Sequence, residues 1–310
     1  MSTGFIGLGR MGRGMSLNLV AHSGTDVIVY DVLPEATEPL RAAGATVADD
    51  VGDLVRRSDV VFTSLPGPVQ LEGIVYGPNG LLANARPGQV VFDLSTSSLS
   101  LARRIHESLA KEGAALLDAP VSGGPAGAAS GDLVLWVGGS RDVYDAHLPL
   151  LSSFSKPAYV GEFGTGTITK LTHNMSGYMI MLSLAETFSV AVKAGADPLE
   201  LWRAIRLGLV GKGSPMDMLV KQFLPGVYEP PAFALKLAHK DVRLATELGR
   251  ELGVPMRLAN LTLEEMTEAL GRGFGDQDSR AYLKLQLERA GVEIAVDPEA
   301  LRLAVEQARG

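Results

Sequence analysis

A glycine-rich turn near the start of the chain limits the possible folds more than any other feature. The apolar segment GFIGL, residues 4–8, runs into a G-x-G-x-x-G turn, and a helical pattern follows over 11–21. The turn consists of Gly7, Leu8, Gly9, Arg10, Met11 and Gly12. A second apolar segment ends at Asp31, nineteen residues after Gly12. A turn of this type between a strand and a helix, followed by an acidic residue about 20 positions later, indicates dinucleotide binding.

The turn and Asp31 also favour one kind of dinucleotide. Glycines let the backbone approach a pyrophosphate, whose charge is stabilised at the N-terminus of the following helix. Asp31 can accept hydrogen bonds from the adenine ribose hydroxyls, and its charge repels a 2′-phosphate. We therefore expect NAD as the cofactor, with NADP less favoured. The alternative is a turn of the same shape that binds no ligand.

The first half of the chain alternates strand and helix patterns. Strands are predicted at 4–8, 26–31, 59–66, 89–95, 114–122, 133–139 and 158–161. Helices are predicted between them at 11–21, 34–43, 68–74, 98–112 and 141–153. Strands that are apolar almost throughout, alternating with helices, are typical of a parallel sheet covered on both faces. The sequence thus predicts an α/β fold with a doubly wound sheet.

The second half carries helical patterns alone. They lie at 167–194, 198–208, 215–224, 234–253, 255–271 and 277–290. We therefore expect two domains, a dinucleotide-binding domain over 1–163 and an all-α domain over 164–310. The apolar run 175–192 includes Glu186, so a buried helix of a soluble protein is favoured over a membrane span.

Composition excludes several classes of function. A net charge of −7 argues against nucleic acid or an anionic membrane as the main partner. The chain has no cysteine, and its five histidines show no metal-ligand spacing, so no metal site is expected. The N-terminus enters a strand almost at once, which leaves no room for a targeting segment. A cytoplasmic protein is the expectation.

Two loops follow predicted strands at the sheet edge where ligands bind in open α/β folds. SLPGP, residues 64–68, contains Leu65 and Pro66, and DLSTSS, residues 93–98, contains Thr96. Small hydroxyl and proline residues suit a wall around the ribose and nicotinamide. Thr96 is either a ligand contact or the N-cap of the following helix.

A glycine-rich segment and a lone lysine mark the substrate end. The segment DAPVSGGPAGAASGDL, residues 118–133, can expose backbone amides that hold a carboxylate, or it is a flexible crossover. Asn174 follows Lys170 by one helical turn, so both side chains can point into one site. Lys170 is either the proton acceptor for an alcohol or a solvated lysine at a helix end.

Four blocks of this chain together resemble the β-hydroxyacid dehydrogenases, which include 3-hydroxyisobutyrate dehydrogenase and tartronate semialdehyde reductase. The blocks are GFIGLGRMGRGMSLNL (4–19), DAPVSGGPAGAASGDL (118–133), GTGTITKLTHN (164–174) and HKDVRLA (239–245). The resemblance covers essentially the whole chain. It implies an N-terminal Rossmann-type domain, a helical C-terminal domain with the site in the cleft between them, and a homodimer or homotetramer.

The resemblance also implies roles for single residues. Lys170 would be the catalytic acid/base, and Asn174 would orient a small carboxylate substrate. Residues expected to bind the substrate are Ser122, Gly123, Gly124 and Phe233. Thr96 would contact the nicotinamide side of the cofactor, and Lys240 would reach the cofactor from the helical domain. The implied reaction interconverts a small β-hydroxy acid and its semialdehyde or keto acid.

Departures from the family pattern leave the substrate open. The segment LVGKGSPM, residues 209–216, differs from a more usual serine-rich stretch, and its Lys212 is an anion contact or an exposed lysine. Trp136 is expected in the core. Three alternatives remain: a 6-phosphogluconate dehydrogenase, for which this chain is too short; an imine reductase, which usually lacks the lysine; and a nucleotide-binding module without catalysis.

Overall fold

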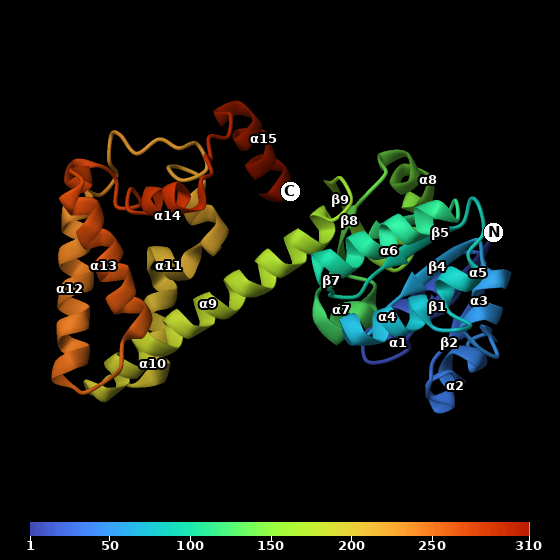
Figure 1. The fold of residues 1–310 in the computed structure, drawn as a ribbon. Coiled ribbons are helices and arrows are strands. Elements are labelled where there is room, and N and C mark those ends of the chain that lie inside the picture. The colour runs from blue at the N-terminus through green and yellow to red at the C-terminus, as the bar shows by residue number, and fades with distance from the viewer. Residues whose placement is uncertain (310) are drawn as a thin grey trace. The chain divides into compact units, whose positions relative to one another are not determined.

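The chain forms two compact units, residues 1–176 and 177–310. The computed structural model describes residues 1–309, and the side chains of all of these except 182, 209, 216, 244, 248, 251, 308 and 309. Figure 1 follows the order of the elements from the N-terminal strands to the C-terminal helices. The predicted division at 163/164 lies at the start of helix α9 (Thr165–Lys193), whereas the two units divide within that helix.

The first unit is a Rossmann-type α/β domain. Its strands are β1 (Ser2–Ile6), β2 (Asp26–Tyr30), β3 (Thr46–Val47), β4 (Val60–Thr63), β5 (Val90–Asp93), β6 (Ala115–Asp118), β7 (Val121–Ser122), β8 (Leu133–Gly138) and β9 (Ser155–Gly161). Its helices are α1 (Gly12–His22), α2 (Glu38–Ala42), α3 (Val51–Arg57), α4 (Pro68–Tyr76), α5 (Leu81–Asn84), α6 (Leu99–Lys111), α7 (Gly124–Ser130) and α8 (Arg141–Ser152). A 3₁₀ turn, η1 (Pro34–Ala36), precedes α2.

The strand order is β3-β2-β1-β4-β5-β6-β8-β7, with β9 paired to β8. Neighbours from β3 to β6 pair in parallel, and β8 runs antiparallel to β6. The sheet is therefore mixed at one side rather than parallel throughout. Because the chain continues from β1 to β2 on one side and returns to β4 on the other, the direction of winding switches between β1 and β4. Ligands of open α/β sheets bind at such a switch point, outside the carboxyl ends of the strands.

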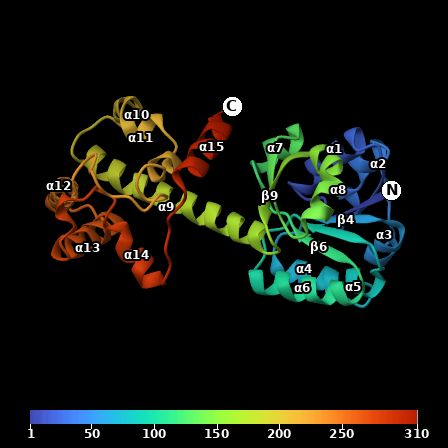
Figure 2. The same ribbon diagram turned by 90° about the horizontal axis from the view of Figure 1, so that it is seen from above.

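Alternation along the strands sends side chains to two separate cores, because successive residues of a strand face opposite sides. One core contains Phe5 and Phe62, together with side chains of α1 and α8. The other contains Ile6 and Val61, together with side chains of α3, α4, α5 and α6. Figure 2 shows the two layers of helices on opposite faces of the sheet. The predicted covering of both faces is confirmed.

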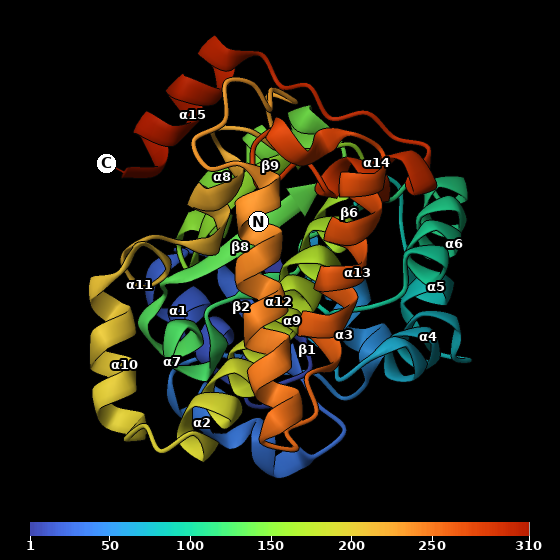
Figure 3. The ribbon, with the colours of Figure 1, turned by 90° about the vertical axis from the view of Figure 1, so that its left-hand side faces the viewer.

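The second unit is helical, as predicted. Its elements are α10 (Pro198–Leu207), α11 (Leu209–Lys212), η2 (Pro215–Leu219), α12 (Leu235–Glu251), α13 (Arg257–Gly271), η3 (Phe274–Asp276), α14 (Leu283–Ala290) and α15 (Pro298–Arg309). Helices α12 and α13 lie side by side (Figures 1 and 3). Their small core includes Tyr228, Leu235, Met266 and Leu285. The predicted helix 215–224 is only the 3₁₀ segment η2, followed by a turn.

Helix α9 (Thr165–Lys193) does not match the predicted burial. Only 6% of its most apolar window is buried in the single chain, and Met175, Tyr178 and Met181 are exposed. By length and composition it could cross a membrane, and it is the one such helix among the described residues. An isolated helix of this kind is weak evidence for a span, because core helices of soluble proteins pass the same test. The exposed apolar side chains of α9 favour contact with another surface, but the helix itself does not indicate which surface that is.

Phenylalanine rings pack against one another in the first core, some stacked and one edge-on, and this packing gives a prediction. Phe62 is fully buried and its ring lies 6.0 Å from that of Phe5 and 5.4 Å from those of Phe92 and Phe154. Phe62→Ala should lower the free energy of unfolding of the first unit by about 3–5 kcal/mol, measured by urea titration. Val69→Ala, at a position that is 78% exposed, is the control and should change it by less than about 0.5 kcal/mol. A loss for Phe62→Ala as small as the control would contradict this packing.

Candidate functional site

The glycine-rich turn joins β1 to α1, and the space around its three glycines differs from one to the next. Gly7 has φ of 94°, and a Cβ on it would lie 2.3 Å from the carbonyl oxygen of Ser64. A Cβ on Gly12 would lie 1.9 Å from the carbonyl oxygen of Gly7. A Cβ on Gly9, by contrast, would meet nothing within 4 Å. Gly7 and Gly12 are therefore required for packing, whereas Gly9 keeps the neighbouring space open.

The N-terminus of α1 faces the same space. The N-cap residue Met11 makes no side-chain hydrogen bond to the first turn. Since the first amides of a helix have no partner within the helix, they are available to an anion, and the helix dipole favours one there. Arg10, which is exposed beside them, adds a positive charge.

Asp31 lies directly after β2 and is tied to the turn. Its Oδ2 accepts a hydrogen bond from the Leu8 amide at 2.6 Å, and its Oδ1 accepts one from the Leu33 amide at 2.9 Å. The two bonds fix the carboxylate, while each oxygen keeps a further lone pair for a ligand. The Leu8 side chain itself is buried in the core, so Leu8 takes part through its amide.

These groups surround a cavity of about 700 Å³. Its lining is Ile6, Gly7, Gly9, Arg10, Met11, Gly12, Tyr30, Asp31, Val32, Leu33, Ser64, Leu65, Pro66, Gln70, Gly73 and Ile74. The structure thus brings the predicted residues of the turn, Asp31, Leu65 and Pro66 together. Open space at Gly9, free helix amides and an anchored acidic residue fit a dinucleotide with its pyrophosphate at α1.

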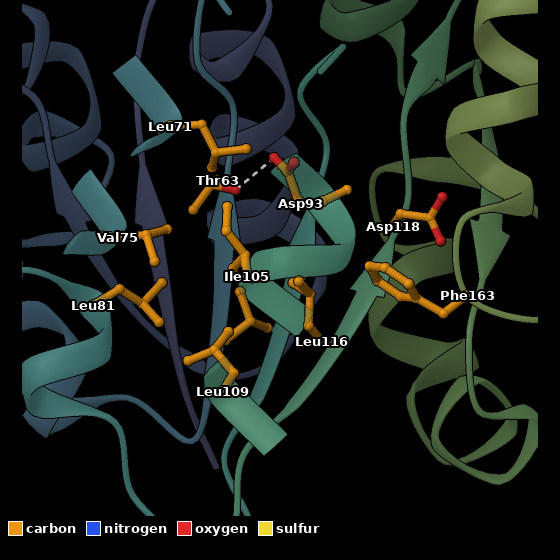
Figure 4. A pocket seen from close by; sticks show the side chains of 12 residues that line it. Thr63, Leu71, Val75, Leu81, Asp93, Ile105, Leu109, Leu116, Asp118 and Phe163 are labelled. Carbon is orange, nitrogen blue, oxygen red and sulfur yellow. Dashed lines mark hydrogen bonds between the residues drawn. The ribbon is translucent and has the colours of Figure 1, made fainter. Parts of the chain in front are cut away.

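A second cavity, shown in Figure 4, has a different character. It lies between the sheet and α4, α5 and α6, and has a volume of about 10 Å³. Its walls are apolar except for Thr63, Asp93 and Asp118. That volume holds about one water molecule, so this cavity is no ligand site.

The loops after β4 and β5 are joined to each other. The Leu65 amide donates to Oγ of the buried Ser95 at 3.0 Å. Thr96, the next residue, is exposed. The N-cap of α6 is Ser98, which accepts from the Leu101 amide at 3.3 Å, so the interpretation of Thr96 as that cap is wrong.

The segment 118–133 is structured rather than a flexible crossover. Ser122 ends β7, and Gly123 and Gly124 follow with φ of 133° and 65° as α7 begins. Helix α7 packs against α1, where Asn18 donates from Nδ2 to the carbonyl oxygens of Ala128 and Ala129 at 3.0 and 3.3 Å. This packing holds the glycine pair, at the start of α7, close to α1, the helix that follows the dinucleotide turn.

Lys170 and Asn174 lie one turn apart on α9. Lys170 is half-buried, and that burial lowers its pKa below the usual value of a lysine. Among the described residues, no side chain forms a hydrogen bond or an ion pair with the Lys170 Nζ.

The Asn174 Oδ1 lies 3.2 Å from Nδ1 of His173, whose ring packs 5.0 Å from that of Trp136. Trp136 is half-buried beside this turn, so its predicted place in the core is wrong.

Phe233 and Lys240 belong to the second unit. Phe233 is 44% exposed in the segment before α12. Lys240 lies on α12 and pairs with Asp241 at 3.0 Å. Lys212 ends the short helix α11 and is exposed. Among the residues that the structure describes, no group of three or more acidic or histidine side chains is placed to hold a metal ion.

Sequence reasoning missed several contributors to the site. Gln70 and Ile74 line the cavity from α4, where their spacing of one helical turn is a usable signal. Asn18 and Ser95 act on carbonyl and amide groups that lie far from them in the sequence. No local pattern indicates such partners.

Two family models match the chain in succession. One, described as the NAD binding domain of 6-phosphogluconate dehydrogenase, matches residues 2–169. The other, described as NAD-binding of NADP-dependent 3-hydroxyisobutyrate dehydrogenase, matches residues 164–286. Together they cover residues 2–286.

Known proteins are similar over nearly the full length. A 2-(hydroxymethyl)glutarate dehydrogenase of Eubacterium barkeri is 33% identical over 94% of this chain and 97% of its own. An NAD-dependent L-serine dehydrogenase of Pseudomonas aeruginosa is 33% identical over 91% of this chain and 96% of its own. An imine reductase of Myxococcus stipitatus is similar in structure, with a TM-score of 0.78 over 92% of this chain and 99% of its own. At 20% identity, that likeness shows the fold alone.

The different surroundings of Gly9 and Gly12 give a prediction. Gly9→Ala places a methyl group in the open cavity, so it should weaken NAD binding about tenfold or more, measured by calorimetry, while the melting temperature stays unchanged. Gly12→Ala, the matched variant, should lower the melting temperature because its methyl group would collide with the backbone of Gly7. Equal NAD affinity for Gly9→Ala and the wild type would show that the cofactor lies elsewhere.

Proposed function

Because the chain belongs to the β-hydroxyacid dehydrogenase family, we propose that Lys170 serves it as the general acid/base. The protein is an NAD-dependent oxidoreductase that interconverts a small β-hydroxy acid and its semialdehyde or keto acid. The main support for this role is the burial of the Lys170 amine, which lowers its pKa. Lys170 also belongs to the unit that contains the dinucleotide cavity.

The chemistry divides between cofactor and protein. Bound NAD supplies the hydride acceptor. Neutral Lys170 takes the proton from the substrate hydroxyl as the carbon loses its hydride, and in the reverse direction the protonated amine returns it. Burial favours the neutral amine, so Lys170 can act as a base at a lower pH than an exposed lysine.

A carboxylate clamp would orient the substrate. We propose that the Ser122 hydroxyl and the amides of Gly123 and Gly124 hold the carboxylate, since the positive φ angles of both glycines turn their amides out of the regular pattern. Asn174 would bond a substrate oxygen from the turn of α9 after Lys170. By the resemblance to the family, Phe233 would contact the substrate.

The remaining contacts concern the cofactor and the assembly. Thr96 would contact the nicotinamide side of NAD, and Lys240 would reach the cofactor from the helical unit.

We further propose a cytoplasmic homodimer or homotetramer in which a second copy covers the exposed apolar side of α9. No nucleic-acid or membrane partner is proposed. The proposed domains remain 1–163 for the dinucleotide and 164–310 for substrate and assembly.

Two other functions compete with this one. An imine reductase would share the fold, and a catalytically inactive module would share the cavity. The presence of Lys170 with Asn174 beside it favours the dehydrogenase, because an alcohol oxidation needs a proton acceptor and simple nucleotide binding does not.

Replacement of the lysine tests the proposal. Lys170→Ala should lower kcat for β-hydroxy acid oxidation by roughly 10²–10⁴-fold and leave the Kd for NAD nearly unchanged, by steady-state kinetics and calorimetry. In the wild type the oxidation rate should rise with pH through the lowered pKa of Lys170, because only the neutral amine accepts a proton. Lys193→Ala, at an exposed lysine in the last turn of the same helix, is the control. A Lys170→Ala enzyme with the wild-type rate would end the assignment.

Cofactor choice gives a separate test. Asp31→Asn removes the negative charge that disfavours a 2′-phosphate, so the ratio of kcat/KM for NAD to that for NADP should fall about tenfold or more. The carbonyl oxygen of the asparagine side chain could still accept the Leu8 amide, which keeps the turn in place. The Leu33 amide would lose its acceptor, but because that hydrogen bond is exposed, water can replace it. An unaltered ratio would mean that Asp31 does not select the cofactor.

A further inference from the structure

A buried aspartate at the end of β6 holds the start of helix α9. Asp118 is only 2% exposed. Its Oδ1 accepts a hydrogen bond from the Gly164 amide at 2.8 Å, and its Oδ2 accepts one from the Thr167 amide at 2.6 Å. Both oxygens are thus committed, each to a different amide, 46 and 49 residues away in the sequence.

The Gly164 and Thr167 amides are at the start of α9, where backbone amides have no acceptor within the helix. The first four amides of a helix have no acceptor within it, and a local Ser, Thr, Asp or Asn usually caps them. Thr165 does not do so here, since its hydroxyl donates to the carbonyl oxygen of Glu162 at 2.6 Å. Asp118 therefore serves as the cap from another strand.

The same turn also lies in direct contact with the sheet backbone. A Cβ on Gly166 would stand 2.5 Å from the carbonyl oxygens of both Asp118 and Trp136. A Cβ on Gly138 would stand 2.5 Å from the Asp118 Oδ1. With no room for either atom, the carboxylate, the two strands and the first turn of α9 define one another's positions.

Lys170 follows Thr167 by three residues, which is about 4.5 Å along a helix axis. We propose that Asp118 is a positioning residue for Lys170: its carboxylate fixes the first turn of α9 and thereby the place of the amine one turn later. This inference rests on the proposed role of Lys170. An error of about 1 Å in the place of a catalytic group can lower a rate by roughly 100-fold.

The neighbouring strand provides a matched comparison. Asp93 ends β5 and is the register partner of Asp118. It too is buried, and this burial raises its pKa above the usual value. The Thr63 hydroxyl at 2.8 Å and the Ser95 amide at 3.0 Å both donate to its Oδ1. Figure 4 shows Asp93 turned toward Thr63, with Asp118 apart from it on the side of Phe163.

The same substitution should therefore have different effects at the two positions. An asparagine at 93 can keep both hydrogen bonds on its one carbonyl oxygen. An asparagine at 118 cannot, because its amide NH₂ would face either the Gly164 or the Thr167 N–H, leaving a buried donor without an acceptor.

The test compares Asp118→Asn with Asp93→Asn in the full-length enzyme. Asp118→Asn should lower kcat roughly 10- to 100-fold with an unchanged Kd for NAD, and Asp93→Asn should keep kcat within about twofold of the wild type. If Asp118→Asn does not fold, Thr167→Pro replaces it, since proline is tolerated in a first helical turn and removes one of the two donors. It should lower kcat in the same way.

A second readout does not depend on catalysis. Reductive ¹³C-methylation allows the titration of Lys170 to be followed by NMR in the protein without substrate, with the signal assigned by its loss in Lys170→Arg. Loosening of the first turn exposes the amine, so the pKa of Lys170 should rise in Asp118→Asn and stay unchanged in Asp93→Asn.

The outcomes separate the two proposals. Unchanged kcat and unchanged Lys170 titration in Asp118→Asn would overturn the positioning role and leave the acid/base role intact. Equal losses in Asp118→Asn and Asp93→Asn would also overturn it, because they would reflect general destabilisation. A shifted Lys170 titration in an enzyme whose Lys170→Ala variant stays active would support the positioning and end the catalytic assignment.

Discussion

The parallel pairing of β1, β4, β5 and β6 brings their carboxyl ends to one edge of the sheet, and the loops of the first unit that form the dinucleotide cavity and carry the glycine pair begin at that edge. The glycine-rich turn follows β1, and Leu65 and Thr96 lie in the loops after β4 and β5. The glycine pair at 123–124 follows β6 by a few residues. The loops that meet there come from four places in the sequence, and the register of the strands brings them close together.

Polar side chains, of which Ser95 and Asp118 are buried, then hold those loops in place. Asp31 accepts the Leu8 and Leu33 amides, Ser95 accepts the Leu65 amide, and Asp118 accepts amides at the start of α9. A hydrogen bond contributes about 0.5–1.5 kcal/mol when both partners are neutral, as at Ser95, and about 1.5–3 kcal/mol when the acceptor is charged, as at Asp31 and Asp118, whereas a buried donor without an acceptor costs about 1–3 kcal/mol. Each acceptor therefore favours one loop conformation strongly over alternatives that would leave its donor unpaired.

Features with local signals could be predicted from the sequence. The dinucleotide turn, Asp31 and most strands depend on neighbouring residues and on periodicity, and the structure contains them. Helix α7 could not be predicted in this way, because the glycines among residues 123–131 disfavour a helix locally. Packing against α1 stabilises it instead. Asp118 could not be recognised as a cap, because its partners are 46 and 49 residues away. The apolar run of α9 predicts a buried helix, which is wrong for the single chain, where only 6% of the most apolar window is buried.

The central claim is that this protein removes a hydride from a β-hydroxy acid. The most direct measurement is the NADH absorbance formed by the wild-type enzyme with NAD and a panel of short β-hydroxy acids, run beside NADH consumption with the matching semialdehydes and with cyclic imines. We expect NADH formation from at least one β-hydroxy acid, reversal with its semialdehyde, and no reduction of the imines. Reduction of an imine with no turnover of any β-hydroxy acid or semialdehyde would contradict this function.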